Sequence, residues 1–270
     1  MINCKLIRIR KILISFLRGG TFLTFIRNAI QPILFIVTFV LFFLLLVLAD
    51  KLSGLGLSNN KNAIESLYLF SVLLAGIFIF PTIRNDFKSR FILHKNKLYL
   101  TIGFPIIIGI LMQFIVTSIR FVPTLLGHEM IGIGSDQITY TTELTKAGFL
   151  FLVTVIGPFQ EELFFRYLLY ARIFLALADF KAKFAWVEKI YNQLFTQKHP
   201  LYIWGWILIT NLGFAFLHGP DISNFYAYFI PGIINALLFL RLGFLSAWLA
   251  HGVFNLSSMI ILSILSFIFL

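Results

Sequence analysis

Two adjacent carboxylates and an arginine lie within an otherwise apolar stretch of this chain, Gln160-Glu161-Glu162-Leu163-Phe164-Phe165-Arg166. On a helix, Glu162 and Arg166 are four residues apart and share a face, so they can neutralise each other. Glu161 and Arg166 are five residues apart and point about 140° away from each other, which leaves Glu161 to face another partner. An unpaired carboxylate in apolar surroundings is suited to general-base chemistry. The alternative is a structural ion pair that holds helices together.

Two later apolar stretches carry a histidine at helical spacing from another conspicuous side chain. Phe214 and His218 are four residues apart and share a helix face, as do His251 and Asn255. The last two could together hold an oxyanion. Each pair alone would be explained by structural or interhelical contacts. Together with Glu161, they supply a base, an imidazole and a pair of hydrogen-bond donors. These are the groups that the attack of water on a peptide carbonyl needs.

The same side chains also suit a divalent metal ion, because Glu161, His218 and His251 are hard or borderline ligands. The zinc motif in which two histidines flank a glutamate on one helix is absent. A single cysteine, Cys4, excludes an internal disulfide and a cysteine-based zinc site. We therefore expect no cofactor, with a divalent metal on these three residues as the alternative.

The composition places these residues in a membrane. Of the 270 residues 59% are hydrophobic and 12% charged, whereas soluble domains have roughly 45–50% and about 25%. An ordinary soluble enzyme and a disordered protein are excluded. The net charge of +11 suggests no nucleic-acid partner, because cationic loops beside membrane-spanning helices and anionic lipid account for it.

Seven apolar stretches are long enough to cross a hydrocarbon core of about 30 Å. They are residues 30–49, 66–83, 98–120, 145–178, 201–218, 225–241 and 243–270. We predict an all-α fold, a polytopic transmembrane helix bundle of seven to eight spans. The stretch 145–178 is too long for one crossing and should protrude, and the last stretch should either break near Gly252 or tilt strongly.

Lysine and arginine are distributed unevenly among the connections. Residues 1–29, 84–97 and 172–198 hold 16 of the 22, whereas 121–144 holds none. The positive-inside rule then predicts a cytoplasmic amino terminus for this integral membrane protein. We expect it in a bacterial inner membrane. We divide the chain into a basic interfacial segment (1–29), accessory spans with an outer loop (30–144) and a catalytic core (145–270). The outer loop, 121–144, is long enough to cover a site.

The three motifs, in this order and on apolar helices, resemble the CPBP family of intramembrane glutamic proteases. This is the group of CAAX-protease and bacteriocin-processing enzymes, also called Abi. The motifs are EExxxR at 161–166, FxxxH at 214–218 and HxxxN at 251–255. The resemblance covers roughly 145–260 and includes the flanking segments FFRYLLYARIF and RLGFLSAWLAHGVFN.

The resemblance implies a role for each motif residue. Glu161 would activate the water, His218 would hold or help deprotonate it, and His251 with Asn255 would stabilise the oxyanion. Supporting roles would fall to Glu162, Arg166 and Phe214. Family members have been described both as metalloproteases and as metal-free enzymes, and the absence of a third clear histidine ligand favours the metal-free mechanism. The implied partners are membrane lipid and a membrane-bound or lipidated peptide, including a prenylated CAAX-type peptide.

Two other functions stay open at this point. A transporter or proton relay would also use buried Glu, Arg and His, although no internal repeat is visible. A non-catalytic membrane immunity or scaffold protein would not require all four polar positions.

One geometric problem also remains. In straight spans, His218 would lie roughly 26 Å farther out than Glu161, at 1.5 Å per residue, so the site requires a tilted or displaced helix.

Overall fold

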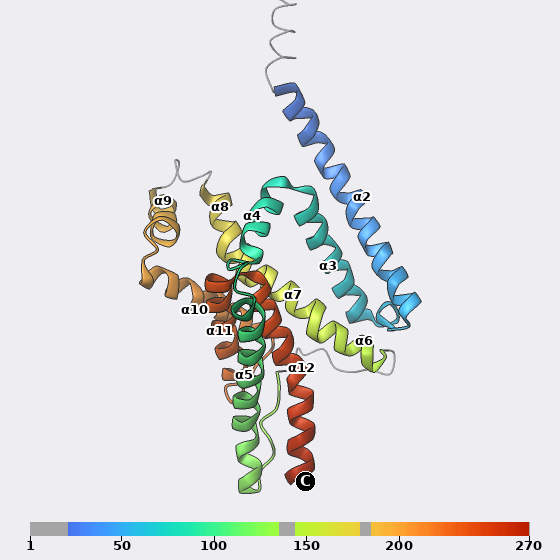
Figure 1. Ribbon diagram of the computed structural model, residues 1–270, viewed down its shortest axis with the longest axis vertical. Helices are drawn as coiled ribbons and strands as arrows, with labels where there is room; N and C mark the ends of the chain where they lie inside the picture. The colour runs from blue at the N-terminus through green and yellow to red at the C-terminus, as the bar shows by residue number, and fades with distance from the viewer. Residues whose placement is uncertain (1–20, 135–143, 179–184, 270) are drawn as a thin grey trace, which may run out of the picture.

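The computed structural model describes residues 21–134, 144–178 and 185–269, and every regular element in these ranges is helical (Figure 1). The all-α prediction is therefore confirmed. Cys4 and most of the basic amino-terminal segment lie outside the described residues. Among the described residues, five helical stretches are long and apolar enough to cross a membrane: Ile30–Ser53, Lys61–Ile79, Tyr99–Leu126, Lys146–Tyr170 and Phe244–Leu265. The chain is an integral membrane protein.

Two further apolar helices are shorter, α10 (Pro200–Phe216) and α11 (Tyr226–Leu242). They correspond to the stretches 201–218 and 225–241 of the sequence prediction. Whether each crosses the whole membrane is not fixed by its length, so a total of seven to eight spans stays a prediction.

The accessory part begins with a hairpin of α2 (Thr21–Ser53) and α3 (Lys61–Ile79). Helix α2 starts before the apolar run at residue 30, so residues 21–29 continue the same helix. Asp50 closes the turn, because its two carboxylate oxygens accept backbone N–H groups of the short helix η1 (Leu57–Asn59), each at 2.8 Å. Asn60 then caps α3 by accepting the N–H of Ala63 at 3.0 Å.

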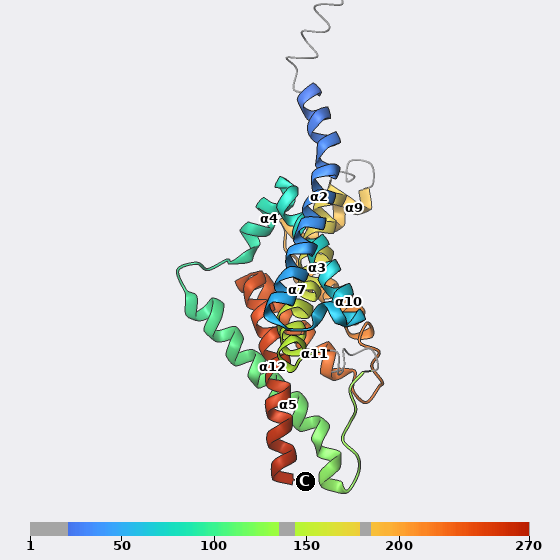
Figure 2. The same cartoon turned by 90° about the vertical axis from the view of Figure 1, so that its right-hand side faces the viewer.

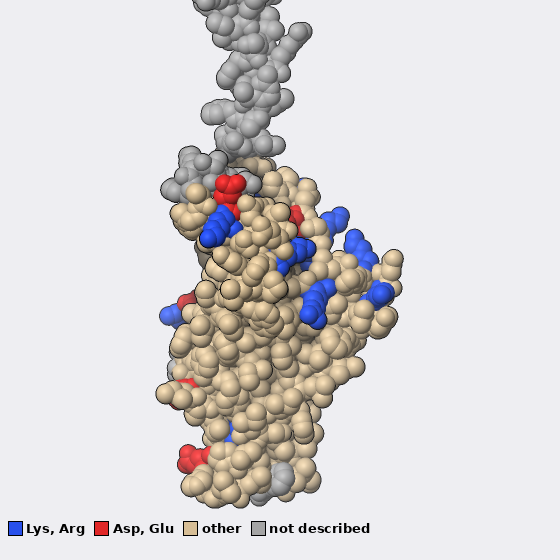
Figure 3. Space-filling view, turned by 90° about the vertical axis from the view of Figure 1, so that its left-hand side faces the viewer, with Lys and Arg blue, Asp and Glu red and all other residues tan. Residues whose placement is uncertain are grey.

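The predicted stretch 66–83 is wrong at its carboxyl end, because the helix stops at Ile79. Phe80 is extended, since the residue before a proline is pushed out of the α region, and Pro81 starts the separate helix α4 (Pro81–Phe91). Helix α4 exposes Arg84 and Lys88. On the face drawn in Figure 3, most Lys and Arg side chains gather toward the upper end of the molecule, where Figure 1 places α4 and α9. This asymmetry agrees with the predicted orientation without fixing it.

One long helical stretch carries the acidic motif from Lys146 to Ala178. It consists of α6 (Lys146–Phe151), η4 (Leu152–Ile156), α7 (Gly157–Glu162), η5 (Leu163–Arg172) and α8 (Ile173–Ala178), where η4 and η5 are π-helical. π-Helical turns leave backbone carbonyls available to other partners. In η4 the Val153 carbonyl accepts Asn255 at 2.8 Å, and the Val155 carbonyl accepts Trp248 at 2.9 Å.

Helix α12 (Phe244–Phe269) supplies both of those partners and passes through Gly252 without a break. The backbone of Gly252 lies directly against the Thr154 carbonyl, where a side chain would collide. Gly252 therefore serves close packing. Of the two alternatives for this stretch, the break at Gly252 is wrong, and the strong tilt stays a prediction. On its other side, α12 crosses α5 (Phe104–Phe121), which follows the π-helical turn η2 (Tyr99–Gly103) (Figures 1 and 2). At this crossing Gly109 faces the Ala250 carbonyl, as small residues do where membrane helices approach closely.

Between α8 and α10 lie α9 (Ala185–Tyr191) and the π-helical turn η6 (Asn192–Thr196). In Figure 1 this connection descends beside α8, so α10 begins well below the end of α8. An aromatic core packs under the acidic motif, with Phe159 and Phe244 in edge contact at 5.2 Å. These elements position α7, which carries Glu161, and α10, which leads to His218.

Candidate active site

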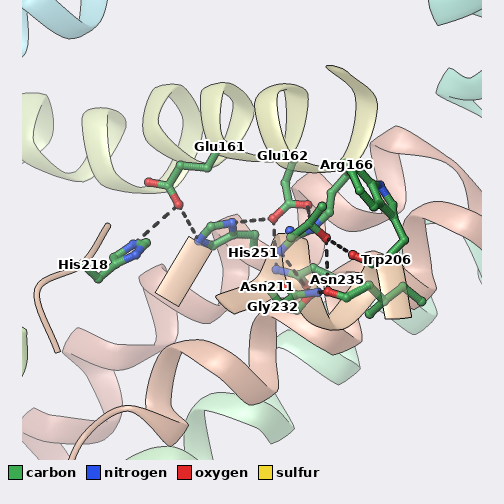
Figure 4. A network of polar contacts seen from close by, with 11 residues as sticks. Glu161, Glu162, Arg166, Trp206, Asn211, His218, Gly232, Asn235 and His251 are labelled. Carbon is green, nitrogen blue, oxygen red and sulfur yellow. Dashed lines mark hydrogen bonds and ion pairs between the residues drawn. The ribbon is translucent and has the colours of Figure 1, made fainter. Parts of the chain in front are cut away.

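Glu161 and Glu162 leave α7 in different directions and enter different surroundings (Figure 4). The side chain of Glu162 is fully buried, and its Oε2 lies 3.2 Å from Nε of Arg166, which is only 1% exposed. The expected pairing of Glu162 with Arg166 is confirmed. The side chain of Glu161, in contrast, is 33% exposed. Adjacent positions on one helix thus separate a closed ion pair from an accessible carboxylate.

Glu162 also holds the catalytic candidate His251. The Nδ1 atom of His251 lies 2.8 Å from Oε1 of Glu162, and the side-chain amide of Asn235 donates to the same oxygen at 3.2 Å. Because a carboxylate paired with arginine is an acceptor, Nδ1 of His251 is the donor. The Nε2 atom of His251 is therefore the one that is turned toward Glu161.

Arg166 is held in place from several sides. One terminal nitrogen donates to the Gly232 carbonyl at 3.1 Å, and the guanidinium lies 5.0 Å from the ring centroid of Phe214. A side chain at Gly232 would collide with Asn211 and crowd Arg166, so glycine is required here. Phe214 also contacts the His218 ring at 4.7 Å and the His251 ring at 5.8 Å. Its expected position near the site is confirmed.

Glu161 faces both histidines. Its Oε2 lies 3.7 Å from Nε2 of His218 and 3.6 Å from Nε2 of His251. The other ring nitrogen of His218 lies 2.8 Å from the Phe214 carbonyl. Since a carbonyl only accepts, Nδ1 of His218 donates, and its Nε2 is a free acceptor in the neutral ring. Distances of 3.6–3.7 Å are too long for direct hydrogen bonds but allow one small molecule to contact all three groups.

Asn255 completes the set of four. Its amide nitrogen uses one hydrogen to donate to Val153 and carries a second. Asn255, Glu161, His218 and His251 all line one cavity of about 280 Å³. The described residues therefore bring together all four candidate catalytic residues that the sequence singled out.

The cavity is built by helices from both halves of the chain. Its other lining residues are Gln113, Val116, Arg120, Ile133, Phe149, Val153, Gly157, Pro158, Phe214, Ala227, Tyr228, Pro231, Asn235, Phe254 and Ser258. The described part of loop 121–144, which we expect to cover the site, reaches the cavity. Ile133 lines the cavity, and the Gly134 backbone packs against the His218 carbonyl.

The predicted depth mismatch between Glu161 and His218 does not occur. Figure 1 shows the stretch from α6 to α8 running obliquely across the bundle. Because α9 and η6 descend beside α8, α10 begins below the end of α8. His218 lies two residues after Phe216, the last residue of α10. The oblique course of one helix and the displaced start of the other bring the two side chains to 3.7 Å.

Two residues around the site were missed in the sequence. Asn235 is a buried amide in the apolar helix α11 and binds Glu162. Like Glu162, Asn235 is a polar residue in an apolar stretch, so the same criterion could have identified it. Tyr228 stacks on His218 with ring centroids 4.7 Å apart. A tyrosine near the start of an apolar helix is too common to be noticed.

A metal ion would have to use the atoms that converge on Glu161. In the described part of the chain, no group of three or more His, Cys, Asp or Glu side chains has the arrangement of a metal site. The donor set of one carboxylate and two imidazole Nε2 atoms is nonetheless chemically suited to a divalent ion.

Comparison with protein families gives an independent result. Residues 143–257 match the model of the type II CAAX prenyl endopeptidase Rce1-like family. This part of the chain is an Rce1-like domain of the CPBP family. The Rce1-like domain contains all seven motif residues, from Glu161 to Asn255, but not α5. Neither the comparison with curated proteins nor that with solved structures found a match.

Proposed function

We propose that this protein is an intramembrane endopeptidase that hydrolyses a membrane-associated, CAAX-type peptide. The observation that carries the proposal is the convergence of Glu161, His218 and His251 on one point of a cavity within an Rce1-like domain. A water at this point would donate one hydrogen to the Glu161 carboxylate and the other to Nε2 of His218. Glu161 then removes a proton, and the resulting hydroxide attacks the scissile carbonyl carbon.

The oxyanion that forms is stabilised from α12. The second amide hydrogen of Asn255 is one donor, and His251 is the other when its Nε2 is protonated. In that state His251 lies between two carboxylates, because Nδ1 donates to Glu162 and Nε2 is next to Glu161. Collapse of the tetrahedral intermediate breaks the C–N bond, and the proton held by Glu161 passes to the leaving amine.

We further propose that the reaction needs no metal, because each motif residue already has a role in the water mechanism. The three side chains around the water would be the ligands if an ion were used, and the ion would then polarise the water or the carbonyl. A chelator therefore separates the two mechanisms. Loss of cleavage with chelator and recovery with one metal would replace the glutamic mechanism.

The test is a mass-spectrometric cleavage assay in lipid, with wild type and Glu161→Gln side by side. Both proteins receive the same panel of prenylated and unmodified membrane peptides, with and without chelator. We expect products with wild type only, unaffected by chelator, at a bond that follows a prenylated cysteine. Equal product with both proteins would contradict the role of Glu161. Cleavage of unmodified peptides alone would contradict the substrate class.

A further inference from the structure

The cavity contains a cation, Arg120, that the water mechanism does not use. Arg120 is in the last turn of α5 and is half-buried. It lines the same cavity as Glu161 but lies outside residues 143–257, so the family match gives it no role. Among the described residues, no carboxylate lies within 4.0 Å of its guanidinium. A partly desolvated charge is stabilised by a counter-charge, and the residues that the structure describes do not supply one.

The guanidinium of Arg120 is held in a fixed orientation. Its Nε donates to the Ile131 carbonyl at 2.9 Å, and the Ile131 N–H donates back to the Arg120 carbonyl at 3.1 Å. This reciprocal pair uses one of the five guanidinium donors. The two terminal nitrogens have no hydrogen-bond partner among the described residues. A planar pair of N–H groups in a fixed position is the arrangement that binds a carboxylate through two parallel hydrogen bonds.

A chain of contacts connects Arg120 with the catalytic end of the cavity. Glu161 faces His218, and the His218 ring stacks on Tyr228 at 4.7 Å. The Tyr228 hydroxyl accepts the N–H of Gly134 at 2.6 Å, three residues after the Ile131 that Arg120 holds. The cavity is therefore lined both by the carboxylate of Glu161, which repels an anion, and by the guanidinium of Arg120, which attracts one.

We propose that Arg120 binds the free carboxylate at the carboxyl terminus of the substrate. This inference rests on the proposed function, and it makes Arg120 a residue that determines specificity and positions the scissile bond. In a CAAX-type substrate, three residues follow the cysteine at which the chain is cut. Three extended residues reach about 10 Å, so a carboxylate held by Arg120 fixes which bond lies next to Glu161. A peptide bound with its carboxylate next to Glu161 would instead meet a like charge, which disfavours the reversed orientation.

The experiment measures binding, so that it does not depend on turnover. Full-length protein carrying Glu161→Gln is placed in nanodiscs and titrated with a fluorescent, farnesylated peptide that ends in Cys-Val-Ile-Ala. The peptide is used as the free acid and as the carboxyl-terminal amide. We expect the acid to bind about tenfold or more tightly than the amide. Adding Arg120→Gln should abolish this difference, by weakening the acid and leaving the amide unchanged, and Arg120→Lys should retain part of it.

Arg84→Gln is the matched control, because Arg84 is an exposed arginine of α4 that does not line the cavity. It should leave the preference for the acid intact. Equal binding of acid and amide in the Glu161→Gln background, or a preference that survives Arg120→Gln, would overturn the role of Arg120 alone. Failure of both peptides to bind would overturn the proposed substrate class together with it. The acid-to-amide comparison needs no change at Arg120, so a folding defect of that variant cannot obscure the answer.

Discussion

The two neighbouring glutamates of α7 are in opposite situations. Glu162 is in a closed network with Arg166, His251 and Asn235, where every group is buried. Glu161 borders an open cavity, and the two histidine atoms nearest to its Oε2 are beyond hydrogen-bond range. One helical turn therefore supplies both the buried glutamate that holds the neighbouring side chains and the accessible glutamate that can react. His251 connects the two, since one ring nitrogen faces each carboxylate.

The largest effect on stability is expected from breaking the closed network. Arg166→Met leaves Glu162 as a buried charge without its main partner, which typically costs about 3–5 kcal/mol of unfolding free energy. Unfolding in mixed detergent micelles measures this loss. The double variant Glu162→Gln/Arg166→Met should recover a large part of it, because both charges are then gone. If Arg166→Met unfolds like wild type, the ion pair does not stabilise this part of the bundle.

A somewhat smaller effect, measured on activity, is expected on the open side. Asn255→Ala removes one oxyanion donor and should lower kcat by about 10²–10³-fold with little change in KM. The matched control is Ser257→Ala on the same helix, since the Ser257 hydroxyl only donates within α12, to Val253 at 2.7 Å. Steady-state kinetics on a prenylated peptide distinguishes the two variants. An unchanged kcat in Asn255→Ala would show that the oxyanion is held elsewhere.

The difference between the glutamates could be predicted from spacing alone. Four residues separate Glu162 from Arg166 and five separate Glu161 from it, and this already assigns the pair. The helical class and most helix positions followed in the same way from apolar runs. Local rules also explain the exception at Phe80, because a proline disfavours the α conformation of the residue before it.

The meeting of Glu161 with His218 could not be predicted, because it depends on tertiary contacts. The π-helical turn η4 persists where Trp248 and Asn255, about a hundred residues later, bind its carbonyls. No local sequence pattern announces such a turn. The close approach of Gly252 to the Thr154 carbonyl likewise packs α12 against the oblique α6–α8 stretch. A layout of straight helices contains neither contact and therefore separates the two catalytic candidates.

The most direct test of the account compares Glu161→Gln with Glu162→Gln for both cleavage and unfolding in the same lipid preparation. Glu161→Gln should lose cleavage by about 10²–10⁴-fold, the usual contribution of a general base, and should unfold like wild type. Glu162→Gln should lower the unfolding free energy, because Arg166 loses its counter-charge. Wild-type cleavage by Glu161→Gln, or an equal loss of stability in both variants, would contradict the division of roles between the two glutamates.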